Sequence, residues 1–253
     1  MNLIGTKTLL LKEIRRFWKV MMQTVMAPMV TTLLFLAVFM LALGRTYDVV
    51  PGVDFIHFLA PGLIMMALAQ NAFANSSSSL IIAKVNNTIV DVIMPPLSPL
   101  ELTTAFALGA VARGFVVAIA VLVSMLPFIP ITVHHWGFLL YHFFSAGLLM
   151  GLLGILTGIW AEKFDNVATI TNFFITPLSF LSGTFYSVQR LPEFWQIVAH
   201  VNPFFYMIDG ARYALTGYND GNLNAGIWVM LLCNCIAAFV CYRWFDRGYK
   251  LQA

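Results

Sequence analysis

The chain has 253 residues, of which 60% are hydrophobic and only 10% are charged, and its formal net charge is +3. Soluble domains carry about 25% charged residues, so this composition excludes an ordinary soluble protein. Apolar segments with short connections take up nearly the whole length. We therefore expect one membrane domain over residues 1–253, and the small positive charge gives no indication of nucleic acid.

A basic amphipathic helix is predicted over residues 3–22, ahead of the first long apolar segment. Five cations lie mostly on its other sides, and its apolar residues recur at helical spacing: Leu3, Leu10, Ile14, Phe17 and Met21. Such a helix lies in the membrane interface with its apolar face toward the lipid. It is either a simple anchor on anionic lipids or, in addition, a docking surface for a cytoplasmic partner.

Six apolar blocks are each long enough to cross a membrane, which takes roughly 20 residues for about 30 Å of hydrocarbon. Because the blocks are continuous and do not alternate, they predict helices rather than the strands of a barrel. The expected spans are residues 25–43, 58–79, 102–127, 137–160, 167–183 and 225–242. The predicted fold class is an all-α integral membrane protein with six transmembrane helices.

The distribution of Lys and Arg predicts the orientation of these spans. Ten of the 14 lie before the first span, in the loops after the second and fourth spans, or after the sixth. Arg45, Arg190 and Arg212 lie in the loops on the opposite side. Since cytoplasmic loops carry the excess of Lys and Arg, both termini are expected in the cytoplasm.

Two predicted spans carry uncharged polar stripes. Asn71, Asn75 and Ser78 fall on one face of the second span, and Asn172 and Thr176 share a face of the fifth. Polar groups do not face lipid cheaply, so these side chains either bond to neighbouring helices or line a wet cavity. The second stripe strengthens the idea of a cavity.

Arg113 lies about eleven residues into the third predicted span, near the middle of the membrane. An intramembrane cation is costly and is a functional candidate by default. It either pairs with a structural partner or contacts an anionic ligand, and the sequence leaves both open.

Glycines form a stripe along the fourth predicted span. Their spacing keeps them on one helix face and lets another helix approach closely: Gly147, Gly151, Gly154 and Gly158. The sequence does not identify which helix packs there.

Residues 84–97 are too polar and too rich in proline to cross the membrane, and they predict a short cytoplasmic helix ended by Pro95 and Pro96. Its apolar residues, Ile89 and Ile93 among them, suit a protein partner or burial against the membrane. A helix that joins two membrane spans in this way can transmit a push to both.

Residues 184–217 are rich in aromatic side chains and predict short helices, one of them beginning at Asn202-Pro203. These helices are too short to cross, so they are interfacial or re-entrant, with aromatic rings at the level of the lipid headgroups. Asp209 and Arg212 are three residues apart and are expected to pair.

Two segments, FLSGTFYSVQRLPEFWQ and HVNPFFYMIDGARYALTG, resemble the ABC type-2 permease family, the membrane subunits of ATP-binding-cassette exporters. The segments APGLIMMALAQNAFANSSSS and VNNTIVDVIMPPLSPLEL are similar to the second span and coupling segment of that family. The likeness covers roughly residues 5–245. Its most specific part is Asn202-Pro203 with Asp209 and Arg212.

The resemblance implies a bacterial plasma-membrane exporter of amphiphiles such as drugs, lipids or lipid-linked glycans. A second permease copy, most simply an identical one, and a cytoplasmic ATP-binding-cassette subunit are the implied partners, besides membrane lipids. ATP and Mg²⁺ would bind to that subunit, and this chain would bind no cofactor or metal. The contacts with the ATPase would fall on the coupling helix: Ile89, Asp91, Ile93 and Pro95.

The absence of certain motifs agrees with this interpretation. The sequence has no Gly-Lys dipeptide and therefore no phosphate-binding loop, and no Asp or Glu lies well inside a predicted span. An ion-driven transporter usually keeps such acids, so a partner ATPase is favoured, with an ion-driven secondary transporter or channel as the alternative. The motifs of intramembrane proteases and of α/β-hydrolases are also absent.

We therefore expect a push on residues 84–97 to open a path between two permeases. The residues expected along this path come from three of the predicted spans: Asn71, Asn75, Ser78, Arg113, Asn172 and Thr176.

Overall fold

The computed structural model describes residues 2–43, 48–50 and 53–251. These residues fold into helices joined by short connections, together with one small antiparallel hairpin of β1 (Asp48–Val50) and β2 (Val53–Asp54). The helical class predicted from the sequence is therefore confirmed. Arg45, which entered the prediction of orientation, lies outside the described residues.

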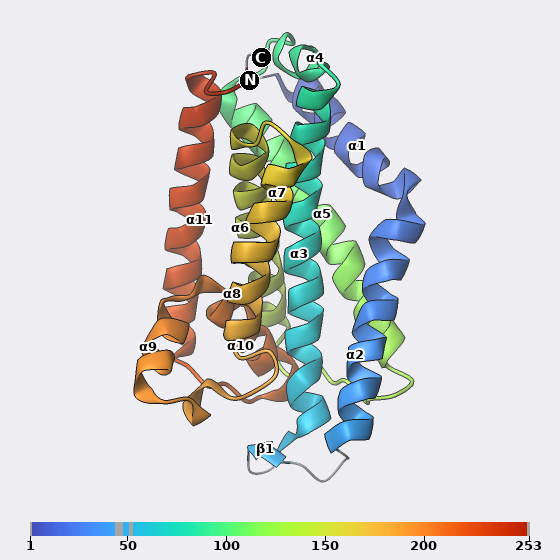
Figure 1. The fold of residues 1–253 in the computed structure, drawn as a ribbon, viewed down its shortest axis with the longest axis vertical. Coiled ribbons are helices and arrows are strands. Elements are labelled where there is room, and N and C mark those ends of the chain that lie inside the picture. The colour runs from blue at the N-terminus through green and yellow to red at the C-terminus, as the bar shows by residue number, and fades with distance from the viewer. Residues whose placement is uncertain (1, 44–47, 51–52, 252–253) are drawn as a thin grey trace.

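In the described part of the chain, five helical stretches are long and apolar enough to cross a membrane. The first joins η1, a π-helical turn, to α2, and the others are single helices that run lengthwise through the molecule (Figure 1). Their bounds are η1 (Met22–Met26) with α2 (Ala27–Leu43), α3 (Phe55–Val85), α5 (Pro99–Met125), α6 (Trp136–Trp160) and α11 (Leu223–Asp246).

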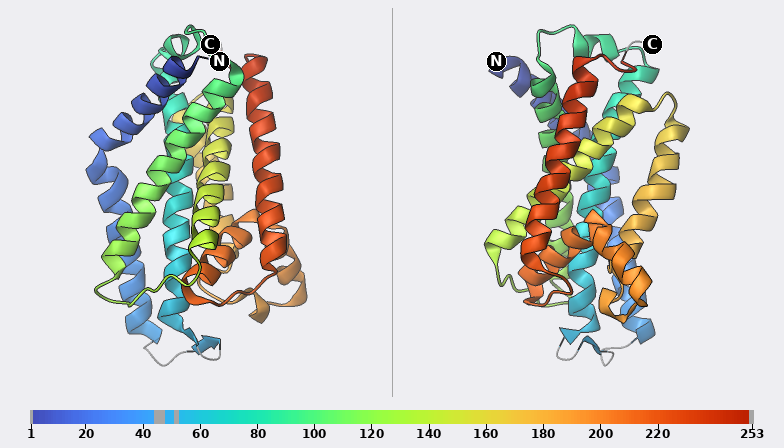
Figure 2. Two further views of the ribbon diagram at one scale, coloured as in Figure 1. Left: turned by 180° about the vertical axis from the view of Figure 1, so that it is seen from behind. Right: turned by 90° about the vertical axis from the view of Figure 1, so that its left-hand side faces the viewer.

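The expected span over 167–183 corresponds to a helical run in three parts. These are α7 (Phe164–Ile170), the π-helical turn η2 (Thr171–Ile175) and α8 (Thr176–Leu181). Pro177 has no amide hydrogen to donate, and the irregular turn comes directly before it, as η1 comes before Pro28. The run extends from the end of the molecule near α4 toward the opposite half (Figures 1 and 2).

The core is built from α3, α5 and α6, which pack against one another. The glycine stripe of α6 lies against two helices: a Cβ on Gly151 would stand 2.7 Å from Ala110 of α5, and one on Gly154 would stand 2.5 Å from the carbonyl oxygen of Phe73 in α3. A side chain at either glycine would overlap its neighbour. The stripe therefore lets α6 pack closely against both helices.

Helix α1 (Leu3–Lys19) does more than rest in the interface as the sequence predicted. It slopes across α5 and packs against it (Figure 2), and it buries Leu9, Glu13 and Phe17. Of the apolar residues that were expected to face the lipid, Leu3 and Met21 are exposed but Phe17 is enclosed by protein. One face of α1 therefore packs against the rest of the protein, and the other face is exposed.

Both termini lie at one end of the molecule together with the short helix α4 (Ile89–Ile93) (Figures 1 and 2). Ser98 caps the following helix α5 in a capping box with Glu101, and Pro99 occupies its first turn. The sharp connection between α4 and α5 thus follows directly from local sequence.

The opposite end holds the β-hairpin, the turn η3 (Val188–Arg190) and two helices, α9 (Glu193–Val201) and α10 (Pro203–Thr216) (Figure 1). The side chain of Asn202 accepts a hydrogen bond from the Phe204 amide at 3.0 Å, and Pro203 follows at the first helical position. Gly217, with φ of +75°, ends α10. The Asn-Pro pair therefore starts a helix, as predicted.

Candidate functional site: a polar groove and its two ends

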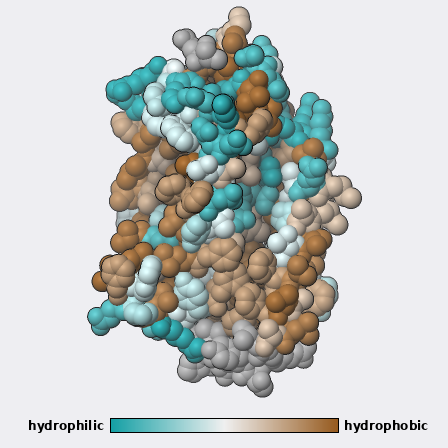
Figure 3. All heavy atoms as spheres, viewed as in Figure 1, coloured by the Kyte–Doolittle hydropathy of each residue, from teal (hydrophilic) through white to brown (hydrophobic). Residues whose placement is uncertain are grey.

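A groove with a polar floor runs beside the middle of α3. One cavity of about 310 Å³ lies between η1 and α2 on one side and α3 on the other, and a second of about 360 Å³ lies between α3 and the α7–η2–α8 run. Gln70 and Asn71 line both cavities, and we call the two together the polar groove. Figure 3 shows hydrophilic atoms reaching from the α4 end toward the middle of this face, between hydrophobic flanks.

Three of the predicted path residues line this groove, namely Asn71, Ser78 and Thr176. Asn172 is exposed on η2 and does not line either cavity. Gln70 was missed by the sequence analysis, although it lies eight residues before Ser78 and so on the same helix face.

Asn75 is fully buried and does not line the groove, contrary to expectation. The cause is Arg16 of α1, whose Nη2 donates to the Asn75 carbonyl oxygen at 2.6 Å and to its side-chain Oδ1 at 3.1 Å. The same guanidinium donates from Nη1 to the Ser78 Oγ at 3.1 Å. Helix α1 therefore covers the part of the predicted polar stripe that lies nearer to α4.

Glu13 brings a carboxylate into the same contact. It is completely buried, accepts a hydrogen bond from the Ser79 Oγ at 2.7 Å and lies 3.2 Å from the Arg16 guanidinium. Gly109 of α5 makes room for it, because a Cβ there would stand 2.8 Å from the Glu13 Cβ. Neither Glu13 nor Arg16 was singled out from the sequence, since both belong to a helix expected in the interface.

Arg113 of α5 lines neither cavity and contacts the groove only through Asn71. Its Nη2 donates to the Asn71 Oδ1 at 3.0 Å, while the Asn71 amide nitrogen donates back along its own helix to the Ala67 carbonyl at 3.0 Å. Asn71 is therefore held in one orientation, between Arg113 and the cavity.

The end of the molecule near the termini presents the α4 segment. Ile89, which was expected to contact the ATPase, is buried with 4% of its surface exposed and offers no surface there. Val90, Ile93 and Met94 are exposed instead, together with Asp91 and Pro95. Because α4 is barely more than one helical turn, neighbouring residues point in different directions and only one side is free.

Helix α4 also faces α1 across a small cavity of about 250 Å³. Lys12 of α1 and Asp91 and Pro95 of the α4 segment line it. At the same end, the Lys84 Nζ donates to the carbonyl oxygens of Ile159 and Ala161 at 2.7 and 2.6 Å, which ties the last turn of α3 to the end of α6. A movement of α4 would therefore reach α1, α3 and α6.

Glu162 and Lys250 form an exposed ion pair beside that contact, with their charged atoms 2.8 Å apart. The hydrogen bond from Lys250 lowers the pKa of the Glu162 carboxyl, and the same bond raises the pKa of Lys250. The pair joins the C-terminal segment to the loop after α6.

The opposite end is held by a buried ionic cluster centred on Arg212, whose side chain has no exposed surface. Its Nη2 donates to the Gly183 carbonyl at 2.6 Å, and its guanidinium carbon lies 3.8 Å from the centre of the Phe58 ring. The predicted partner Asp209 is 4.0 Å away, whereas Asp220, which the sequence did not single out, lies closer at 3.6 Å. The pair inferred from helical spacing is therefore only part of this cluster.

The two carboxylates of the cluster hold the surrounding backbone. Asp209 accepts hydrogen bonds from the amides of Asp220 and Gly221, at 2.6 and 3.0 Å. Asp220 accepts from the hydroxyls of Ser187 and Tyr218, both at 2.6 Å. Burial and the neighbouring Asp220 raise the pKa of Tyr218 to about 12, so its hydroxyl keeps the proton that it donates.

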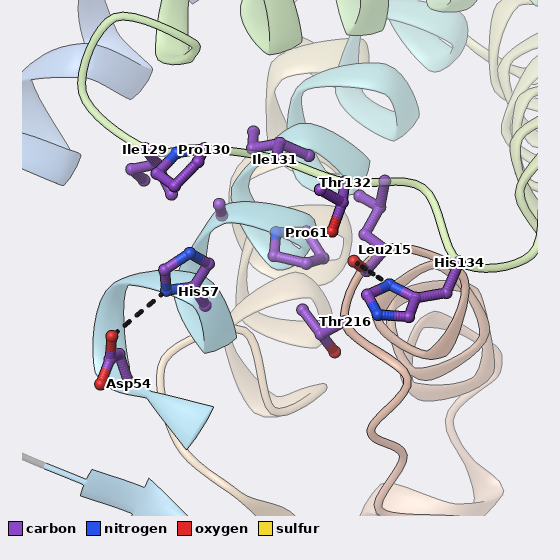
Figure 4. A pocket seen from close by; sticks show the side chains of 11 residues that line it. Asp54, His57, Pro61, Ile129, Pro130, Ile131, Thr132, His134, Leu215 and Thr216 are labelled. Atoms are coloured by element: carbon purple, nitrogen blue, oxygen red, sulfur yellow. Dashed lines mark hydrogen bonds and ion pairs between the residues drawn. The ribbon is translucent and has the colours of Figure 1, made fainter. Parts of the chain in front are cut away.

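A third cavity of about 300 Å³ opens at this end, between the start of α3, the 129–134 segment and the end of α10 (Figure 4). His57 lies 3.5 Å from Asp54 on one wall, and His134 bonds to the Leu215 carbonyl on another. Among the residues that the structure describes, no group of three His, Cys, Asp or Glu side chains is arranged to hold a metal.

Comparisons with known proteins agree with this arrangement. The sequence profile of the ABC-2 type transporter family matches residues 5–216. The chain is 34% identical over 250 residues to the inner membrane transport permease YadH of Escherichia coli strain K12, in an alignment that covers 99% of this chain and 98% of that protein. Permeases of the same name from Escherichia coli O157:H7 and Shigella flexneri match to the same extent. This chain therefore belongs to the ABC-2 type transporter family, as a membrane transport subunit rather than an enzyme.

Proposed function

We propose that this chain is the permease subunit of an ABC exporter, that it works as a homodimer, and that it moves an amphiphilic molecule out across the bacterial inner membrane. The observation that carries the proposal is the polar groove, whose floor of Gln70 and Asn71 lies between walls that combine apolar side chains with neutral polar ones. Such a groove suits a molecule with a polar head and an apolar body. The name of the similar Escherichia coli permease supports the location.

The proposed topology has six crossings. Both termini lie at the same end, which requires an even number, and the α7–η2–α8 run supplies a crossing in addition to the five long helices. The end with α4 and the termini carries most of the Lys and Arg, so this end is assigned to the cytoplasm. Helices α9 and α10 then lie on the outer side, as interfacial or re-entrant elements.

The energy for transport would come from a separate cytoplasmic ATPase that binds ATP and Mg²⁺. The sequence lacks a phosphate-binding loop of its own, and the exposed apolar side of α4 offers a docking surface. Closure of the ATPase pair would push α4, and the push would move α3 and α5, which flank it. Since Arg16 and Glu13 link α1 to α3, the first helix would move with them.

An ion-driven transporter remains the second candidate, because the buried carboxylate of Glu13 is the type of group that such a protein uses. Its partners argue against this role, since Arg16 and Ser79 already satisfy both of its oxygens. Transport that follows an imposed proton gradient and is lost in Glu13→Gln would favour the second candidate.

The decisive experiment is reconstitution with an ATP-binding-cassette subunit of the same organism, sought first among the neighbouring genes. We expect the two to copurify and to give ATP-dependent transport of a fluorescent phospholipid in proteoliposomes. An ATPase with an inactivated phosphate loop is the matched control. Equal transport with that control would overturn the proposal.

The coupling surface can be tested in the same system. Ile93→Asp places a charge on the exposed side of α4 and should uncouple ATP hydrolysis from transport by about tenfold, whereas Met94→Leu, which keeps the surface apolar, should not. For each variant, the coupling ratio is measured as the amount of substrate moved per ATP hydrolysed. An unchanged ratio in Ile93→Asp would remove α4 from the mechanism.

A further inference from the structure

Arg113 is a half-buried cation in a membrane-spanning helix, without a counter-ion. It lies halfway along α5, and in the described part of the chain no carboxylate approaches it within 4.0 Å. Its one recorded hydrogen bond goes to the neutral Asn71 side chain, and its Nε is buried without a partner. A cation inside a membrane span with an unused buried donor is costly, so this arrangement needs a reason beyond packing.

A second cation lies close by. Arg16 bonds to Asn75, one helical turn along α3 from the Asn71 side chain that Arg113 contacts. Glu13 is the one carboxylate that pairs with either of them among the described residues. Two cations and one anion leave one positive charge in excess, and the Asn75 amide nitrogen adds another unused buried donor.

The excess charge lies directly behind the polar groove. Asn71 lines both cavities of the groove and accepts from Arg113. The cavity toward α2 combines polar groups such as Gln23 and Thr32 with the apolar side chains of Phe35 and Leu63, and no residue that lines either cavity is charged. A ligand there would meet apolar and neutral polar side chains, with the Arg113 guanidinium behind Asn71.

We propose that Arg113, held by Asn71, recognises the acidic head group of an anionic amphiphile in the polar groove. A guanidinium presents its donors as a planar fork that fits a phosphate or a carboxylate, and its attraction is strong where water is excluded. The inference rests on the proposed function, because the groove is taken as the substrate path. The same head-group chemistry belongs to a transported molecule and to a resident acidic phospholipid.

The test measures binding to the purified full chain in a neutral detergent, without any ATPase. Dodecyl phosphate is the probe, and dodecyltrimethylammonium and dodecyl maltoside provide the opposite and the neutral head group. We expect dodecyl phosphate to bind best, and Arg113→Leu to weaken it about tenfold or more. Arg113→Lys keeps the charge without the fork and should fall between. Arg15→Leu removes an exposed cation of α1 and should have no effect.

Thermal unfolding without ligand separates recognition from a structural role. Because Arg113 has no ion pair, Arg113→Leu should melt at the same temperature as the parent chain or higher. Equal affinity for the three amphiphiles, or undiminished dodecyl phosphate binding in Arg113→Leu, would overturn the proposal. So would a melting temperature that falls in both Arg113→Leu and Arg113→Lys.

The source of the ligand is resolved in nanodiscs of phosphatidylcholine with or without phosphatidylglycerol. A resident lipid would compete with dodecyl phosphate and would remain bound in native mass spectra of the parent chain but not of Arg113→Leu. A transported molecule would show neither effect, and its binding would still depend on Arg113. This binding assay contains no nucleotide and no ATPase. A failure of ATP-driven transport would therefore contradict the proposed function but would leave the binding result unchanged.

Discussion

The two buried ionic regions of the molecule have opposite charge balances. At the end of the molecule that holds α9 and α10, Arg212 lies between Asp209 and Asp220, so one cation faces two carboxylates. Beside the groove, Glu13 pairs with Arg16 alone, and among the described residues no carboxylate pairs with Arg113. A buried cation with carboxylate partners is part of the folded core, and its removal leaves those carboxylates uncompensated. A cation without such a partner, as beside the groove, is a candidate for ligand contact.

The largest expected effect tests this contrast. Arg212→Leu leaves two carboxylates buried without their cation, and removal of one partner of a buried pair costs about 3–5 kcal/mol. We expect a large fall in melting temperature for Arg212→Leu and none for Arg113→Leu. Equal behaviour of the two variants would end the distinction between the regions.

A smaller loss is expected when α1 is detached. Arg16→Leu removes three hydrogen bonds to α3 and strands the Glu13 carboxylate, and a bond to a charged group contributes about 1.5–3 kcal/mol. Hydrogen exchange should increase along α1. Adding Glu13→Leu removes the stranded charge and should restore part of the stability. A further loss in the double variant would contradict this account.

Two glycines of α6 allow a test of apolar packing, in which the expected loss of stability is similar to that for α1 or smaller. Gly154→Ala would place a Cβ 2.5 Å from the Phe73 carbonyl oxygen, and overpacking typically costs about 1–3 kcal/mol. Gly137→Ala, on the same helix with open space around it, should be neutral or slightly stabilising. The two melting temperatures should therefore move apart.

The smallest effect concerns the exposed pair of Glu162 and Lys250. Lys250 lowers the folded-state pKa of Glu162 below its ordinary value of 4.5. The pair therefore stabilises the fold at pH values above 4.5, and this contribution is lost as the pH falls through the lowered pKa. Lys250→Met should lower the melting temperature slightly at neutral pH and not at strongly acidic pH. High salt should reduce the difference.

Much of the fold follows from patterns that are local in the chain. Apolar length placed the membrane helices, the Asn202-Pro203 pair started α10, and the glycine spacing marked the closely packed face of α6. These features depend on helix geometry and on residues within a few positions of one another, so periodicity is enough to find them. The resemblance carried by the segments around η3, α9 and α10 then pointed to the family.

The buried polar partners depend on contacts between residues far apart in sequence. Arg16 meets Asn75 across 59 positions and Glu13 meets Ser79 across 66, so the polar stripe of α3 was assigned to a path although α1 covers part of it. The contact of Asp220 with Arg212 and the burial of Ile89 likewise depend on how separate elements pack together. A periodic sequence shows which side of a helix is polar, but only the packing of other helices decides whether that side meets an ion, a ligand or water.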